Sequence, residues 1–211
     1  RGGGPRLRTC AAARRFGRRD GGALAARWRR DGGAASMRRL VAPEFTPKAM
    51  RTREESLTLH AQKYADQFWE KVATKGTADL VEDLAVKLPL ATICEMMGAS
   101  PEDWEQVHAW TAVMFDDPSL MRFAEKGESK KEMRRRMFVE FEDWIFEQIA
   151  ERRSTDCSGP DLISILLRSE IEGEPLTPQQ LLGYIRVLIA AGNETTRNAA
   201  TGGMIVLLEN P

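Results

Sequence analysis

Residues 189–197 read Ile-Ala-Ala-Gly-Asn-Glu-Thr-Thr-Arg, and they lie inside the longest helical pattern of the chain. The pattern opens at Thr177-Pro178 and continues to Glu209. Threonine is a good N-cap and proline suits the first helical position, so we expect the helix to begin at Pro178. At about 1.5 Å per residue, a helix of roughly 32 residues is about 48 Å long. Such a helix can cross a whole domain.

Several residues of this stretch are unusual inside a helix. Gly192 costs about 1 kcal/mol relative to alanine. The hydroxyls of Thr195 and Thr196 can bond to carbonyl groups one turn back, which favours a kink. Spacings of three and four residues place on one face Val187, Leu188, Ala191, Gly192 and Thr195. We therefore expect a second body to approach the backbone at Gly192, with Glu194 beside this gap as a candidate proton carrier.

A purely structural interpretation of the same residues stays open. Glu194 can pair with Arg197 at the i, i+3 spacing on a solvated face, and Gly192 can mark close packing between helices. A membrane span is not expected, because Arg186, Glu194 and Arg197 interrupt any run of about 20 apolar residues.

The stretch Ala191-Gly192-Asn193-Glu194-Thr195-Thr196 resembles a known motif. It is similar to Ala/Gly-Gly-x-Asp/Glu-Thr-Thr/Ser, the oxygen-activation motif in the long central helix (helix I) of cytochrome P450 monooxygenases. The flanking residues Leu-Ile-Ala-Ala and Gly-Met-Ile-Val-Leu-Leu-Glu-Asn-Pro are similar to those of the soluble bacterial branch.

A second resemblance lies at residues 37–50, which read Met-Arg-Arg-Leu-Val-Ala-Pro-Glu-Phe-Thr-Pro-Lys-Ala-Met. This segment is similar to the end of helix C and the start of helix D in bacterial P450s. Arg38 matches the arginine that binds a haem propionate, a contact suited to a guanidinium group. The family's histidine would fall at Ala34, so that ligand is absent.

The resemblance covers residues 37–211 in order and implies the all-α class: helices C to I of the P450 fold, without the β domain and the haem-thiolate loop. It implies catalytic roles for Thr195, which would hydrogen-bond the bound oxygen, and for Glu194, which would relay protons through water. The residues expected at the haem are Arg38, Ala191, Gly192 and Thr195. The residues expected to line the substrate pocket are Val187, Ala190, Ala191 and Met114, although core packing is the alternative for Met114.

The resemblance also implies haem b as the cofactor of a full-length relative, with the axial cysteine beyond the end of this chain. We expect the fragment alone to be inactive and not to retain haem. The implied partners are dioxygen, a small hydrophobic substrate such as a sterol or branched lipid, and a ferredoxin with its NAD(P)H-dependent reductase. Neither nucleic acid nor a membrane span is expected.

Composition limits the function classes. The chain has 211 residues, zero formal net charge and 42% hydrophobic residues, enough for one sizeable core. Cys10, Cys94 and Cys157 show no paired spacing, which indicates no disulfide framework and fits a reducing cytoplasm. The only histidines are His60 and His108, and no Cys/His cluster has metal-site spacing.

Residues 1–36 differ from the rest of the chain, being rich in Arg, Gly and Ala without a hydrophobic period. We therefore divide the chain into this atypical segment and a partial P450 domain, residues 37–211. The segment can be a basic nucleic-acid-binding arm, a mitochondrial transit peptide, or DNA translated out of frame, which the abrupt change at Met37 favours. A different function class also stays open, an all-helical binding or regulatory module with this basic arm and no catalysis. A pseudogene product without a role is a further alternative.

Further helices are predicted between the two motifs. We expect them at Thr46-Pro47 to about Thr74, at Leu80–Met97 with Asp79 as cap and a kink at Pro89, at Pro101 to about Phe115, in the segment before Arg153, and at Leu162–Ser169. Gly98 should end the second of these helices. Residues 171–175 should form a turn before the long helix.

Overall fold

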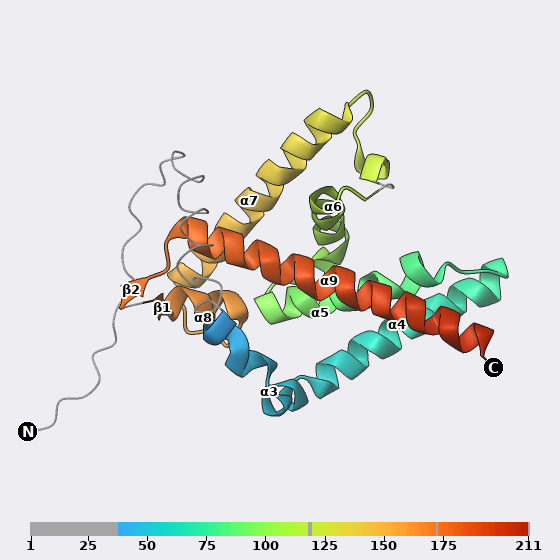
Figure 1. The fold of residues 1–211 in the computed structure, drawn as a ribbon, viewed down its shortest axis with the longest axis horizontal. Coiled ribbons are helices and arrows are strands. Elements are labelled where there is room, and N and C mark those ends of the chain that lie inside the picture. Colours follow the sequence, from blue (N-terminus) through green and yellow to red (C-terminus); the bar gives the residue numbers. More distant parts are fainter. Residues whose placement is uncertain (1–37, 118–119, 172, 211) are drawn as a thin grey trace, which may run out of the picture.

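The computed structural model describes residues 38–117, 120–171 and 173–210. In this part of the chain a long helix, α9 (Pro178–Glu209), crosses the whole molecule (Figure 1). The only strands described form a two-stranded antiparallel hairpin before it, in which β1 (Glu170–Ile171) pairs with β2 (Glu174–Pro175). The predicted all-α class is confirmed. The atypical segment 1–36, with its three interpretations and its boundary, lies outside the described residues.

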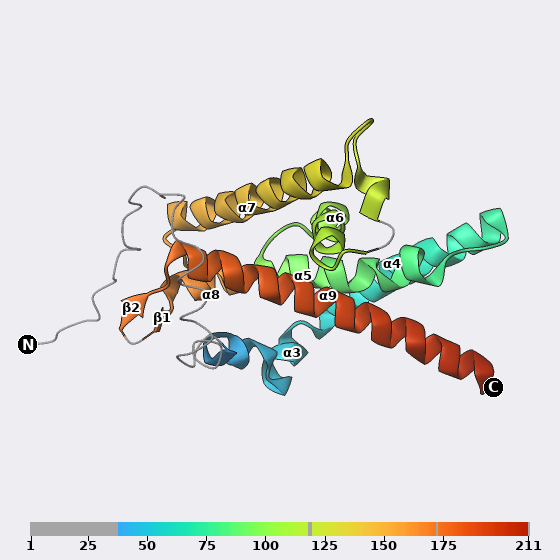
Figure 2. The same cartoon turned by 45° about the horizontal axis from the view of Figure 1, so that its top comes forward.

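The other elements follow one another as short and long helices. In chain order they are η1 (Ala42–Phe45), α3 (Pro47–Thr52), α4 (Glu54–Lys75), the π-helical turn η2 (Val81–Ala85), α5 (Lys87–Met97), η3 (Pro101–Asp103), α6 (Trp104–Met114), η4 (Leu120–Phe123), α7 (Lys130–Ser154) and α8 (Leu162–Arg168). Helices α6 and α7 lie on one side of α9 and α3 lies on the other, whereas α4 crosses behind α9 (Figure 2). Helix α5 packs directly against α9.

Local sequence signals set most helix ends. Helix α9 begins at Pro178 and ends at Glu209, as predicted, and a capping box closes its first turn: the Gln180 N–H donates to Thr177 Oγ1, and the Thr177 N–H donates to Gln180 Oε1. At the start of α8, the Asp161 side chain accepts a hydrogen bond from the Ser164 N–H. Gly98 ends α5 in the left-handed conformation with φ of 74°.

Two breaks differ from the prediction. The single helix expected from Pro47 to Thr74 is divided at Arg53, whose N–H donates to the Met50 carbonyl oxygen three residues back at 3.0 Å and whose guanidinium binds Glu44, 3.4 Å away. The kink expected at Pro89 takes the form of the π-helical turn η2 just before α5. Proline lacks the N–H that a continuous helix would require, and the backbone departs from the regular α-helix in this turn, upstream of Pro89.

The core lies where α5, α6, α7 and α8 meet the N-terminal half of α9. Trp110 of α6 stacks on Phe141 of α7 with ring centroids 5.1 Å apart. Arg152, 7% exposed, donates to the carbonyl oxygens of Met97 and Gly98 and binds Asp161 at 2.7 Å. The buried guanidinium is therefore satisfied, and it joins the ends of α5, α7 and α8.

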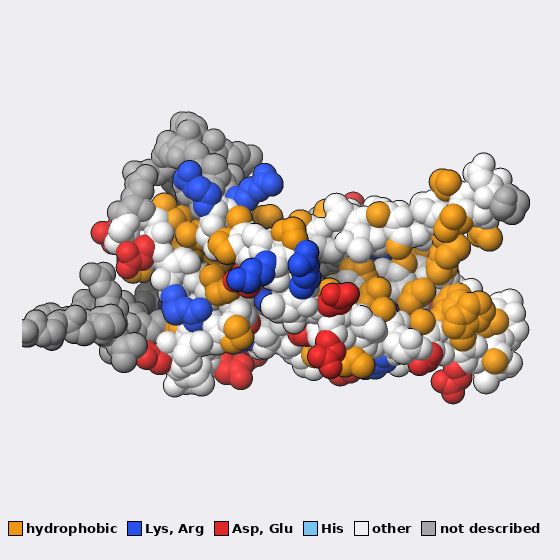
Figure 3. Space-filling model, turned by 90° about the horizontal axis from the view of Figure 1, so that it is seen from below, with side chains coloured by type: hydrophobic (Ala, Val, Ile, Leu, Met, Phe, Trp, Pro, Cys, Tyr) orange, Lys and Arg blue, Asp and Glu red, His pale blue; other side chains and the backbone are white. Residues whose placement is uncertain are grey.

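Apolar side chains also remain on the surface. Figure 3 shows hydrophobic side chains gathered at the end of the molecule where α9 finishes. The exposed residues of this region include Trp69 of α4 and four consecutive residues of α9, Ile205 to Leu208. Within the described residues, no helix is both long enough and apolar enough to cross a membrane.

Candidate functional site

Helix α9 is buried along one stripe and uncovered along the opposite one. Leu181, Ile185, Ile189 and Asn193, each four residues from the next, are at most 1% exposed. The opposite stripe, which we call the open face, consists of Tyr184, Val187, Ala191 and Thr195. Val187 is 58% exposed, and Ala191 and Thr195 are exposed as well. Tyr184 is half-buried and packs against the core cluster, so the open face is exposed from Val187 to Thr195, where the sequence motif lies.

The Thr195 hydroxyl closes a local hydrogen bond on this open face. Its Oγ1 donates to the carbonyl oxygen of Ala191, 2.7 Å away and one turn back. Thr196 makes the equivalent bond to Gly192 at 3.1 Å. Both bonds are those expected from the sequence, and α9 nevertheless continues through residues 192–196 as an unbroken helix. The Thr195 oxygen keeps its accepting capacity towards the open side.

Glu194 lies at the edge of the open face in a half-buried ion pair. Arg197 Nη2 donates to Glu194 Oε1 at 2.5 Å, and Asn198 Nδ2 donates to the same oxygen at 3.3 Å. The Glu194 and Arg197 side chains are only 25% and 16% exposed. Arg197 Nη1 also lies 3.7 Å from Asp117 Oδ2, beyond the end of α6. The i, i+3 pairing that the sequence left open does form, but in a half-buried setting that includes a second carboxylate.

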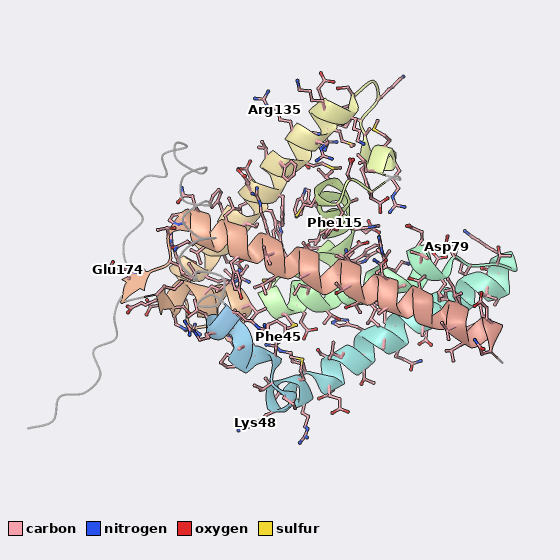
Figure 4. The ribbon with its side chains drawn as sticks, in the orientation of Figure 1. Phe45, Lys48, Asp79, Phe115, Arg135 and Glu174 are labelled. Atoms are coloured by element: carbon pink, nitrogen blue, oxygen red, sulfur yellow. The ribbon has the colours of Figure 1, made fainter. Side chains whose placement is uncertain are left out.

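Gly192 faces away from the open face, towards α5. A Cβ atom at this position would lie 3.4 Å from Cδ1 of Ile93, which is ordinary contact. Gly192 and Thr196 line an apolar cavity of about 740 Å³ between α3, α4, α5 and α9, whose wall also includes Phe45. Figure 4 labels Phe45 close to these helices. Ala191 and Thr195 do not line the cavity, so it is distinct from the open face.

Arg38 acts electrostatically on Tyr184, the first residue of the open face. Burial raises the pKa of Tyr184, and the positive charge of Arg38 opposes this rise. A haem-binding role for Arg38 stays a prediction.

Met114, the predicted pocket residue on α6, is half-buried and packs against the core cluster. Its neighbour Phe115 is 49% exposed, and Figure 4 shows it at the end of α6, close to the middle of α9. Ala190 is half-buried on the flank of α9 between Val187 and Glu194. Pocket roles for Met114 and Ala190 stay predictions.

Sequence reasoning missed two residues that contact the motif. Asp117 is 80 positions away from Arg197 along the chain, and nothing near it in the sequence indicates this pairing. Thr111 of α6 accepts a 3.3 Å hydrogen bond from Nδ2 of the buried Asn193, whose Oδ1 has no partner among the described residues. A polar residue on the buried stripe was the only available signal.

The described cysteines are buried thiols. Cys94 is 1% exposed, and burial raises its pKa to about 12, so it stays protonated at neutral pH. Cys157 is also buried. Among the described residues, no group of three His, Cys, Asp or Glu side chains is arranged to hold a metal ion.

Comparison with known proteins gives consistent relatives. No protein-family model matches the chain. The chain is 32% identical over 177 residues to a steroid C26-monooxygenase of Rhodococcus jostii, which covers 83% of this chain and 34% of that protein. It is 35% identical over 180 residues to the cytochrome P450 monooxygenase PikC of Streptomyces venezuelae, with 83% and 39% covered. The chain therefore spans less than half the length of these curated relatives.

Solved structures agree. A cytochrome P450 of Mycobacterium marinum in complex with pseudoionone superposes with a TM-score of 0.72 and 29% identity, covering 86% of this chain and 42% of that one. A polyketide synthase cytochrome P450 of Bacillus subtilis superposes with a TM-score of 0.67, also at 29% identity, covering 85% and 42%.

Proposed function

The chain belongs to the cytochrome P450 family, and from this premise we propose that it supplies the oxygen-activation helix and part of the substrate pocket of a haem-thiolate monooxygenase. The product would be a hydrophobic substrate carrying one atom from dioxygen. The observation that supports this proposal most directly is the open face of α9, where Thr195 and the neighbouring Glu194 lie beside uncovered small side chains.

The residues present fit a haem on the open face. Ala191 offers a small exposed side chain against which a flat macrocycle could lie, and Arg38, whose charge acts on Tyr184 of the same face, would bind a propionate. Gly192 faces α5 in this structure, so its contribution to the site would be backbone shape. When bound, haem with an axial thiolate supplies dioxygen binding and the electron density that favours O–O cleavage.

The chain's own contribution would be to deliver protons. The Glu194 carboxylate would take a proton from solvent and pass it through water towards Thr195 Oγ1, which lies one residue further along α9. The Thr195 hydroxyl would then turn from the Ala191 carbonyl oxygen towards the open side and donate there. Val187, Ala190, Ala191 and Met114 would exclude bulk water and hold the substrate.

The described residues offer no suitable thiolate, since Cys94 is a protonated buried thiol and Cys157 is buried as well. We therefore expect the 211-residue chain alone neither to retain haem b nor to hydroxylate a substrate. Mixed with haem, reduced and exposed to carbon monoxide, it should give no absorption band of a thiolate-ligated haem. A band of that kind would contradict the expectation.

A sterol or a branched lipid is the substrate class that we propose. The name of the Rhodococcus relative, a steroid C26-monooxygenase, supports this choice. The uncovered Val187 and the exposed Phe115 give the site apolar surface for such a molecule. Electrons would come from a ferredoxin and its NAD(P)H-dependent reductase.

The test of the proposed function uses a longer haem-loaded protein, in which this chain is joined to the part of the family fold that supplies the thiolate. Thr195→Ala should raise the hydrogen peroxide released per NAD(P)H consumed by about tenfold or more, the usual scale for losing a positioned proton donor. Product per NAD(P)H should fall in parallel.

Thr196→Ala is the matched control, because it removes an adjacent hydroxyl with the same kind of bond to the helix backbone. Thr196 faces the apolar cavity and should leave the coupling ratio unchanged. Equal coupling in the wild type and in Thr195→Ala would remove Thr195 from the proposed role.

A further inference from the structure

Arg197 is a half-buried cation shared between two carboxylates. Its Nη2 binds Glu194 Oε1 at 2.5 Å, and its Nη1 lies 3.7 Å from Asp117 Oδ2. The three side chains are between 16% and 25% exposed. Charges this far from water need partners, and a planar guanidinium can satisfy two at fixed directions. The position of the Glu194 carboxylate is therefore set by an arginine that a third residue also holds.

The C-terminal end of α6 determines where Asp117 lies. Asp116 adopts a left-handed conformation with φ of 53°, and the Asp117 N–H then donates to the Ala112 carbonyl oxygen at 3.0 Å. This turn folds the chain back over the last turn of α6. The backbone of Asp117 is consequently attached to the helix end that carries Met114 and Phe115.

The two adjacent aspartates have different partners. Asp116 Oδ1 binds Lys130 at 2.9 Å and Arg134 at 2.7 Å, both on α7. Asp117 binds Arg197 on α9. One carboxylate thus joins the turn to α7, whereas the other joins it to the helix of the candidate site.

Other charges near this turn are already engaged. Arg122 binds Glu82 at 2.8 Å and contacts the ring of His108 at 3.3 Å. His108 is 5% exposed, and burial and then Arg122 lower its pKa to about 4, so it is neutral at neutral pH. Neither residue therefore replaces Arg197 beside Glu194.

We propose that Asp117 and Arg197 are positioning residues for Glu194, and that together they couple the end of α6 to the proton carrier of α9. A hydrophobic ligand that shifts Met114 or Phe115 shifts Asp117, which loosens Arg197 and frees the Glu194 carboxylate to turn towards the open face. The functional part of this inference rests on the proposed monooxygenase function.

The first test measures rotation of the Arg197 guanidinium about its Cζ–Nε bond by ¹⁵N exchange NMR on the 211-residue chain. Asp117→Asn removes the charge at one end of the bridge and should speed the rotation about fivefold, the factor that corresponds to about 1 kcal/mol of ion pairing. Asp116→Asn is the matched control, because it neutralises the neighbouring carboxylate and asparagine tolerates its left-handed backbone. It should leave the rotation rate unchanged.

Equal rotation rates in the two variants would overturn the proposal that Asp117 holds Arg197, an arrangement that we call the clamp. Should Asp117→Asn fail to fold, Asp117→Glu keeps the charge and must retain the slow rotation; fast rotation in that folded variant would equally count against the proposal.

The second test separates this inference from the proposed function. In the longer haem-loaded protein, Asp117→Asn should raise peroxide release about threefold over Asp116→Asn, a smaller effect than that of Thr195→Ala because Glu194 itself remains. If Thr195→Ala uncouples the protein and Asp117→Asn does not, the positioning role is overturned alone. If Thr195→Ala leaves coupling intact, the monooxygenase role of α9 fails, and the guanidinium rotation still decides whether the clamp exists.

Discussion

The two halves of α9 have similar apolar content and opposite environments. Ile185 and Ile189 in the first half are at most 1% exposed, whereas Leu207 and Leu208 in the second half are 67% and 74% exposed. Helices α5 to α8 pack against α9 mainly along the first half. In the second half Glu194, Arg197 and Thr201 are half-buried, whereas Ile205 to Leu208 are exposed. The contrast shows that an apolar helix sequence predicts packing against another element, but it does not predict which part of the helix is covered.

The largest expected effect tests this contrast directly. Ile185→Ala removes a fully buried side chain and should lower the free energy of unfolding by about 3 kcal/mol, through lost burial and the cavity left behind. Leu207→Ala should change it by less than about 0.5 kcal/mol, because that side chain is already in water. Urea denaturation followed by circular dichroism measures both. Similar losses would mean that the second half is packed in solution.

Acid should destabilise the chain through His108 of α6. Its pKa is lowered to about 4 in the folded chain by burial and by Arg122, against 6.5 when unfolded, so the unfolded chain binds more protons between these values. The stability that the neutral His108 ring contributes to the folded chain is complete above pH 6.5 and is lost as the pH falls towards 4. With about 1.4 kcal/mol per pH unit as the upper slope between 6.5 and about 4, we expect a loss of at most about 3 kcal/mol.

The measurement compares the wild type with His108→Gln by urea denaturation at several pH values, so that the titration of the carboxylates cancels. The stability difference between the two proteins should shrink below pH 6.5. A difference independent of pH would show that His108 is not buried as a neutral ring.

The smallest expected effect concerns two glycines of α9. Gly203→Ala places its Cβ in open space and should stabilise the chain by about 1 kcal/mol, since alanine favours the helix. Gly192→Ala should gain less, because its Cβ would meet Ile93 at 3.4 Å. Thermal unfolding of both variants would check the order, and a larger gain at Gly192 would contradict the observed packing against α5.

How far the sequence could predict the site depends on the range of each contact. The Thr195 bond to Ala191 and the Glu194–Arg197 pair lie within one helical turn, so spacing alone indicates them. Asp117 could not be found in this way, because its distance from Arg197 depends on how α6 ends and how it crosses α9. The break at Arg53 was missed because neither a glycine or proline nor a side-chain cap marks this position in the sequence.

The sequence by itself determined the all-α class, the bounds of α9 from Pro178 to Glu209, and the motif that identifies the family. These depend on caps, periodicity and short-range spacing, which are properties of neighbouring residues. Only the tertiary structure decided that Gly192 faces α5, that Thr195 lies on the open face, and that Arg197 is divided between Glu194 and Asp117. Packing made those choices, because the side of a helix that is buried depends on the position of helices distant in sequence.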